Sequence, residues 1–174
     1  TGGRIGLNGN ETNPFEDLDN GDVVGGGKGK AGDYKDYVFC ANVGSTDVLI
    51  EYPSTPTPAD VLASGNCIAG AVYGGAENGH VMGDTKVTIK NGVIGHSIFG
   101  GGSGKGTFET KLLKIGKTVG STNEDDYYTR KIYSITAGKV FGKTEVIMEN
   151  GYVVRNIYGG GNMGSVGKGN YAGG

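Results

Sequence analysis

Residues 81–101 read VMGDTKVTIKNGVIGHSIFGG, and residues 140–160 read VFGKTEVIMENGYVVRNIYGG. The two stretches align without a gap, and the identities include the Asn-Gly pair and the closing Gly-Gly pair. A phrase of this length that recurs intact is typical of repeat proteins, in which each copy is one structural unit stacked on the next. The sequence therefore predicts an extended scaffold rather than a fold built around one catalytic cavity.

Shorter copies of the phrase recur elsewhere in the 174 residues. Residues 44–50 match 83–89, and residues 67–75 match 93–101. Smaller fragments lie at residues 2–6, 23–27 and 164–167. We expect residues 1–174 to form a single β-solenoid segment that is part of a longer repeat array. The expected insertions, which would form surface loops, lie near residues 7–21, 28–39, 52–64 and 103–136.

The strand prediction comes from the stretch Thr85–Lys90, which alternates apolar or hydroxylated residues with polar ones. This period of two places Thr85, Val87 and Ile89 on one buried face of a strand. The equivalent inward residues in the other copies are Thr46, Val48, Ile50, Thr144, Val146 and Met148.

The outward positions of the same copies carry Asp47, Lys86 and Glu145. A second outward set is Glu51, Lys90 and Glu149. If the copies stack in chain order, each column alternates in sign, which favours that register by roughly 0.2–1 kcal/mol per pair. The alternative is a solvated face whose charges follow no rule.

Glycine marks the corners between the expected strands. Asn91-Gly92 and Asn150-Gly151 suit a tight turn with positive φ, and the glycine runs suit close backbone approach. Strand, corner and strand over ~26 residues predict one coil of a right-handed parallel β-helix. Helix signals are scarce, and only residues 59–63 and 111–115 could form a helical turn or two.

Composition excludes several classes of protein. The chain has 37 glycines, about three times the usual ~7%, but no three-residue glycine period, so it is not collagen. The net charge of −2 gives no electrostatic case for binding nucleic acid or an anionic membrane. No run approaches ~20 apolar residues, so we expect no transmembrane helix. Cys40 and Cys67 could form a disulfide or remain as two buried thiols.

The segment containing Asp17, Asp19 and Asp22 is the one candidate metal site. Its carboxylates alternate around a glycine, which is a partial ligand set for calcium. The alternative is an acidic surface turn without metal. We expect no other cofactor.

A second candidate lies in the longest insertion, where Asp125 and Asp126 precede Tyr127 and Tyr128. Tyrosine rings beside carboxylates can bind sugars or partner proteins, because the ring offers both stacking area and a hydroxyl. The alternative is a hydrated loop with its tyrosines packed on the scaffold. His80 and His96 are expected to point outward without a specific role, and we predict no catalytic residues.

The phrase, carried by residues 43–51, 67–75, 81–102 and 140–161, resembles the glycine-rich repeats of adhesin-like surface proteins of gut bacteria. The resemblance implies a right-handed β-helix and a secreted or cell-surface location, and it implies no catalytic residues. The large insertions depart from a regular array.

These observations favour a non-enzymatic extracellular β-helix that acts as a rigid stalk, a filament or a surface-binding scaffold. Its expected partners are further repeats of the same protein, a second copy, or host or dietary glycans and surface proteins. Two alternatives remain open. One is a carbohydrate-active or glycan-binding β-helix, and the other is a segment of a phage tail fibre or tailspike.

Overall fold

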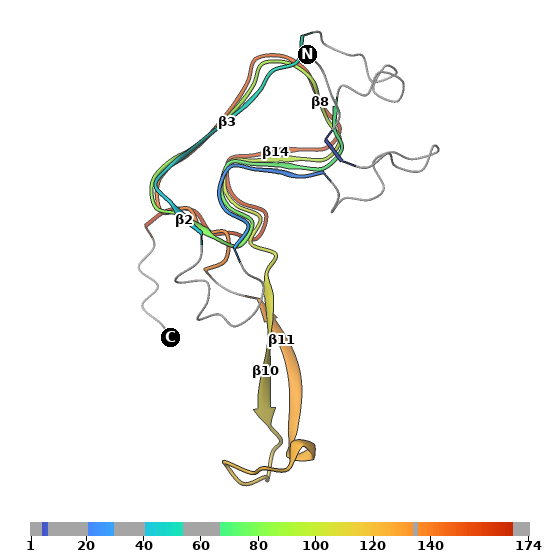
Figure 1. The fold of residues 1–174 in the computed structure, drawn as a ribbon, viewed down its shortest axis with the longest axis vertical. Coiled ribbons are helices and arrows are strands. Elements are labelled where there is room, and N and C mark those ends of the chain that lie inside the picture. The colour runs from blue at the N-terminus through green and yellow to red at the C-terminus, as the bar shows by residue number, and fades with distance from the viewer. Residues whose placement is uncertain (1–4, 7–20, 30–40, 54–66, 134–135, 169–174) are drawn as a thin grey trace, which may run out of the picture.

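The computed structural model describes residues 5–6, 21–29, 41–53, 67–133 and 136–168. The chain is all-β, with parallel sheets and one antiparallel hairpin (Figure 1). Within these residues there is no α-helix, and the only helical element is the 3-10 turn Glu124–Asp126. The fold class predicted from the sequence is thus confirmed at the level of a parallel all-β structure.

The strands of the repeat are short, and most of them span two residues. They are β1 (Val23–Val24), β2 (Asn42–Val43), β3 (Thr46–Ile50), β4 (Cys67–Ile68), β5 (Val72–Tyr73), β6 (His80–Val81), β7 (Thr85–Ile89), β8 (Val93–Ile94), β9 (Ile98–Phe99), β12 (Thr144–Met148), β13 (Tyr152–Val153) and β14 (Ile157–Tyr158). We call one pass through these strands a rung, and a set of equivalent strands in successive rungs a column.

Four columns of parallel strands result. Their orders are β3-β7-β12, β4-β8-β13, β1-β5-β9-β14 and β2-β6, and the last is continued by the bridges Val81–Val140 and Val140–Val166. Figure 1 looks along the stacking direction, and the ribbons of the successive rungs superimpose in this view.

The register between rungs matches the alignment of the repeated phrase. Val87 lies opposite Val48 on one side and Val146 on the other. The short fragments also align as predicted, because Val24 pairs with Tyr73 and the bridge from Ile5 reaches β4. Each rung therefore places the same residue types on top of one another.

The core lies on the inward face of the long strands, as the period of two predicted. Val87, Ile89 and Thr85 are buried, and Val48 and Ile50 lie against them in the same cluster. Thr88 is also buried, although the alternation predicted an outward position, so the middle strand is covered on its outer face at this residue. Cys67 packs against Val93, while Cys40 lies outside the described residues.

The two kinds of glycine corner have different causes. Gly92 and Gly151 adopt φ of +118° and +110°, a region that disfavours side chains. At each Asn-Gly corner the asparagine Oδ1 accepts a hydrogen bond from the glycine N–H. Gly100 is needed for space instead, because a Cβ there would lie 2.5 Å from the carbonyl oxygen of Gly159 in the next rung.

The long insertion forms an antiparallel hairpin of β10 (Thr107–Leu113) and β11 (Tyr127–Tyr133). Figure 1 shows it extending away from the stacked strands. The helical turn predicted near residues 111–115 is wrong, because residues 111–113 pair with β11 instead. Pairing across the hairpin therefore overrides the local helix preference.

Candidate functional site

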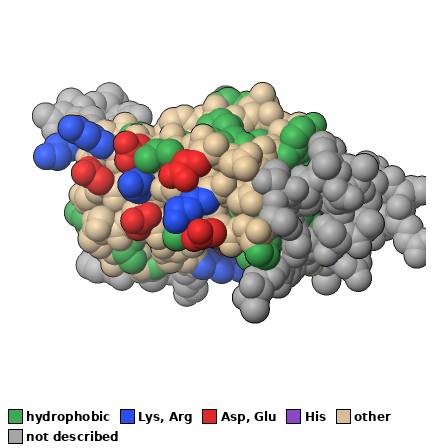
Figure 2. Space-filling model, turned by 90° about the horizontal axis from the view of Figure 1, so that it is seen from above, with side chains coloured by type: hydrophobic (Ala, Val, Ile, Leu, Met, Phe, Trp, Pro, Cys, Tyr) green, Lys and Arg blue, Asp and Glu red, His purple; other side chains and the backbone are tan. Residues whose placement is uncertain are grey.

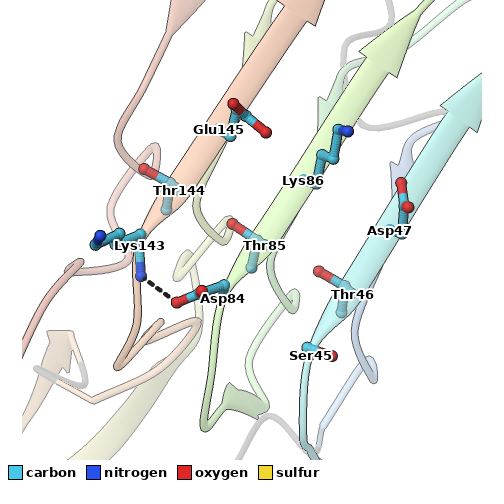
Figure 3. A pocket seen from close by; sticks show the side chains of 9 residues that line it. All are labelled: Ser45, Thr46, Asp47, Asp84, Thr85, Lys86, Lys143, Thr144 and Glu145. Carbon is cyan, nitrogen blue, oxygen red and sulfur yellow. Dashed lines mark hydrogen bonds between the residues drawn. The ribbon is translucent and has the colours of Figure 1, made fainter.

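An open groove of about 740 Å³ crosses the sheet where β3, β7 and β12 begin (Figure 3). It is formed by three equivalent residues from each strand start, so the repeat itself builds the groove. The lining residues are Ser45, Thr46, Asp47, Asp84, Thr85, Lys86, Lys143, Thr144 and Glu145.

Charges alternate across the groove. Lys86 lies in register between Asp47 and Glu145, as the column prediction required. In the neighbouring row, the backbone N–H of Lys143 donates to Oδ1 of Asp84 at 2.8 Å. Figure 3 shows these side chains arranged in rows across the three strands.

The same mixture of charge extends along this sheet. Figure 2 shows acidic and basic side chains interspersed over one face of the molecule. In the second outward set, four residues further along the chain, Lys90 Nζ lies 3.4 Å from Glu51 Oε2, and both groups are exposed. An exposed pair of this kind contributes at most about 1 kcal/mol to the free energy of folding. It therefore favours this register over a slipped one but adds little to the overall stability.

The threonines at the bottom of the groove are not available to a ligand. The Oγ1 of Thr85 donates inward to the carbonyl oxygen of Gly100 at 2.6 Å. The groove therefore offers ammonium groups and carboxylates, together with the Ser45 hydroxyl. This chemistry suits hydrogen bonding to a polar ligand, and it singles out no nucleophile or acid–base pair.

The calcium candidate is described only in part. Asp17 and Asp19 lie outside the described residues, whereas Oδ1 of Asp22 accepts a hydrogen bond from the backbone N–H of Ala71 at 2.6 Å. Asp22 therefore joins the first rung to the second. Among the residues that the structure describes, no three His, Cys, Asp or Glu side chains are grouped so that they could hold a metal ion.

The candidate loop residues lie at the outer end of the hairpin, where most of their polar groups bind within the loop. Asp126 accepts a hydrogen bond from Ser121 Oγ at 2.6 Å and pairs with Lys117 Nζ at 2.9 Å. The hydrogen bond from Ser121, and then that from Lys117, lowers the pKa of Asp126. These contacts close the loop internally.

The neighbouring residues divide into two kinds. The hydroxyl of Tyr127 donates to the Ser121 carbonyl at 3.0 Å, so this ring is held inside the loop. Asp125 and Tyr128 are exposed. The four predicted binding residues are therefore close together in the chain, but only these two present side chains to solvent.

The prediction for His80 is wrong. His80 is only 7% exposed and the equivalent Lys139 only 6%, although both were expected to point outward. Nδ1 of His80 lies 3.1 Å from Oδ1 of Asn42, and Lys139 Nζ lies 4.7 Å from the centre of the Phe141 ring. Burial, opposed in part by a hydrogen bond to the Thr136 backbone, lowers the pKa of His80, and the charge of Lys139 adds to the lowering.

A second hollow, of about 470 Å³, lies at the glycine corner beside β1 and β5. Its lining includes Asp22, Lys28, Tyr73, Glu77 and Lys105. Burial, followed by the charge of Asp22, raises the pKa of Tyr73.

Sequence reasoning missed Ser45, Asp84 and Lys143 as groove residues. Each precedes the threonine that begins a long strand, so their common position in the phrase was the available signal. That they line one groove depends on the parallel register, which brings three strand starts side by side.

No helix in the described part of the chain is long and apolar enough to cross a membrane. No protein-family model, curated protein or solved structure matches this chain. A function for it is therefore argued from its own sequence and geometry.

Proposed function

We propose that this chain is a segment of a non-enzymatic, extracellular, right-handed parallel β-helix that serves as a rigid structural or adhesive scaffold. Its ends accept further rungs, either from repeats of the same protein or from a second copy. The extracellular location rests on the resemblance to adhesin-like repeats, and the scaffold role rests on the geometry of the stack.

One observation carries the scaffold role. Ile98 in the third rung is 0% exposed, whereas the equivalent Ile157 in the last rung is 46% exposed. Phe99 and Tyr158 differ in the same way, at 5% and 44%. Positions that are core inside the stack are thus surface at its end, and only another rung would bury them as the inner rungs do. The other exposed apolar residues of the last rungs are Tyr152, Val154, Met163 and Val166.

An aromatic column supports the same reading. The rings of Tyr73 and Phe99 stack with their centres 5.0 Å apart, and Phe99 stacks on Tyr158 at the same distance. A further ring on the outer side of Tyr158 would continue the column. Stacked aromatic pairs contribute about 0.5–1.5 kcal/mol beyond the area that they bury.

A substitution at a corner glycine can distinguish the folding of this chain from the stacking of a further rung onto it. A Cβ on Gly74 would lie 2.4 Å from the carbonyl oxygen of Gly100, and one on Gly100 would lie 2.5 Å from that of Gly159. A Cβ on Gly159 meets no described atom within 4 Å. We therefore expect Gly159→Ala to leave this chain folded and to block the approach of another rung.

The test combines mass photometry with electron microscopy over a range of concentrations. We expect wild type to form end-to-end oligomers or rods, and Gly159→Ala to remain monomeric with the melting temperature that wild type shows at low, monomeric concentration. A wild-type protein that stays a strictly monodisperse monomer at high concentration would contradict end stacking. A closed trimer that Gly159→Ala does not affect would favour the tail-fibre alternative.

The groove favours glycan binding as a second candidate function. It is open and lined by hydroxyl, carboxylate and ammonium groups, which are suited to sugar hydroxyls. Binding to a glycan array, lost in Lys86→Gln but retained in Lys111→Gln on the hairpin, would support it. Release of reducing sugar from the same glycans would instead contradict the non-enzymatic proposal.

A further inference from the structure

We propose that the outer edge of β12 is a docking site for a parallel β-strand that carries cationic residues opposite Glu145 and Glu149. This inference rests on the proposed function, because it identifies the chemistry of the strand that continues the sheet. The occupant has the pattern of β7, in which threonine, valine and isoleucine alternate with lysine.

The first step is that β12 is an unfilled edge. In the described residues its only strand neighbour is β7, whereas β7 is paired on both sides. Val146 and Met148 on β12 are half-buried, while the equivalent Val87 and Ile89 are fully buried. A further strand would complete both the backbone pairing and the apolar face.

The second step is the charge of the edge. Lys86 lies between Asp47 and Glu145, and the next outward column brings Lys90 beside Glu51. The basic strand β7 is thus enclosed by the acidic strands β3 and β12. On β12, Glu145 and Glu149 are exposed, so the next strand in the column meets two carboxylates.

The third step compares a basic strand with the edge strands of a second copy. A β3 strand laid against β12 in the same register would bring Asp47 to Glu145 and Glu51 to Glu149. A second β12 would also oppose acid to acid. Like charges directly opposite one another are modestly destabilising, so β12 favours a basic strand over either edge strand of a second copy, although the apolar columns still allow a second copy to stack. β7 already lies inside its own sheet and cannot serve.

The experiment uses two synthetic peptides and the isotopically labelled full chain. The first peptide has the sequence of residues 82–92, MGDTKVTIKNG, and the second has both lysines replaced by glutamate. Backbone amide shifts in nuclear magnetic resonance report binding residue by residue, which separates the β12 edge from the similarly acidic β3 edge.

We expect the lysine peptide to shift the β12 amides and to bind about tenfold more tightly than the glutamate peptide at low salt. The ratio should shrink at about 1 M salt, where the Debye length is only about 3 Å. In the double variant Glu145→Lys, Glu149→Lys, the preference at β12 should reverse, while that at β3 should not change.

Equal affinity of the two peptides for β12 would overturn the charge selection, and no shift at β12 with either peptide would overturn the docking site. Neither result would decide the proposed scaffold role, because that role is judged from rod formation by the whole chain, which also involves the column of β1, β5, β9 and β14. The control variant Lys111→Glu, on the hairpin, should leave the peptide preference unchanged.

Discussion

Thr85 on β7 donates a buried hydrogen bond from Oγ1 to the carbonyl oxygen of Gly100, at 2.6 Å. The same bond joins Thr46 to Gly74 in the rung before it. In the last described rung it joins Thr144 to Gly159. Each bond ties the start of the long strand to the glycine corner of its own rung. The inward threonine thus supplies a hydrogen-bond donor to a corner carbonyl that faces the interior.

Replacing Thr85 with valine should lower the free energy of unfolding by about 1–3 kcal/mol, because a buried carbonyl loses its hydroxyl donor while the side-chain shape is kept. Thr85→Ser should recover part of the loss. The matched control is Thr144→Val in the more exposed last rung, where the cost should be smaller. Urea unfolding measures all three, and equal losses at the two sites would contradict the role of burial.

Gly100→Ala should destabilise the chain by about 1–3 kcal/mol, since its Cβ would overlap the backbone of the next rung. Gly159→Ala should change the free energy of unfolding by no more than about 0.5 kcal/mol. Thermal and urea unfolding of the two variants at low protein concentration provide the comparison. Equal destabilisation by both would show that conformational preference, and not rung spacing, sets the glycine requirement.

Val87→Asp should unfold the stack, because an unpaired carboxylate at a fully buried position costs far more than a domain of this size can lose. The control is Leu49→Asp on β3, where the side chain is exposed and the change should be near neutral. Circular dichroism and melting temperature decide the result. A Val87→Asp variant that keeps the wild-type melting temperature would contradict the observed inward face.

The stacked strands are predictable from the sequence because the repeat carries its own register. Val87 and Val146 occupy the same position in the repeated phrase, and parallel pairing of the copies requires them to lie opposite one another. The Asn-Gly corners are equally predictable, since few dipeptides tolerate the positive φ observed at Gly92 and Gly151.

The remaining features depend on contacts that the repeat does not encode. The hairpin pairs Leu113 with Tyr127 inside an insertion, so a comparison of the copies of the phrase does not predict this pairing. The ion pair between Lys117 and Asp126 likewise arises only once the loop closes. The pattern assigns His80 to the surface because a lysine occupies its equivalent position, yet both side chains are buried.

The burial of His80 makes the free energy of unfolding depend on pH. The pKa of His80 is lowered in the folded chain by burial and by Lys139, whereas in the unfolded chain it lies near 6.5. The unfolded state therefore binds more protons once the pH falls below about 6.5. The free energy of unfolding should be constant above that pH and should decline below it, at no more than about 1.4 kcal/mol per pH unit.

Urea unfolding of wild type and His80→Gln between about pH 5 and 7.5 tests this dependence, with the pH range chosen around the ordinary histidine pKa of about 6.5. The slope should be present in wild type and reduced in the variant, because glutamine does not titrate. Asp126 does not interfere, since its lowered pKa makes its contribution complete above about pH 4 and lost only in stronger acid. If the free energy of unfolding had the same dependence on pH in both proteins, protonation of His80 would not destabilise the folded chain, and the prediction would be wrong.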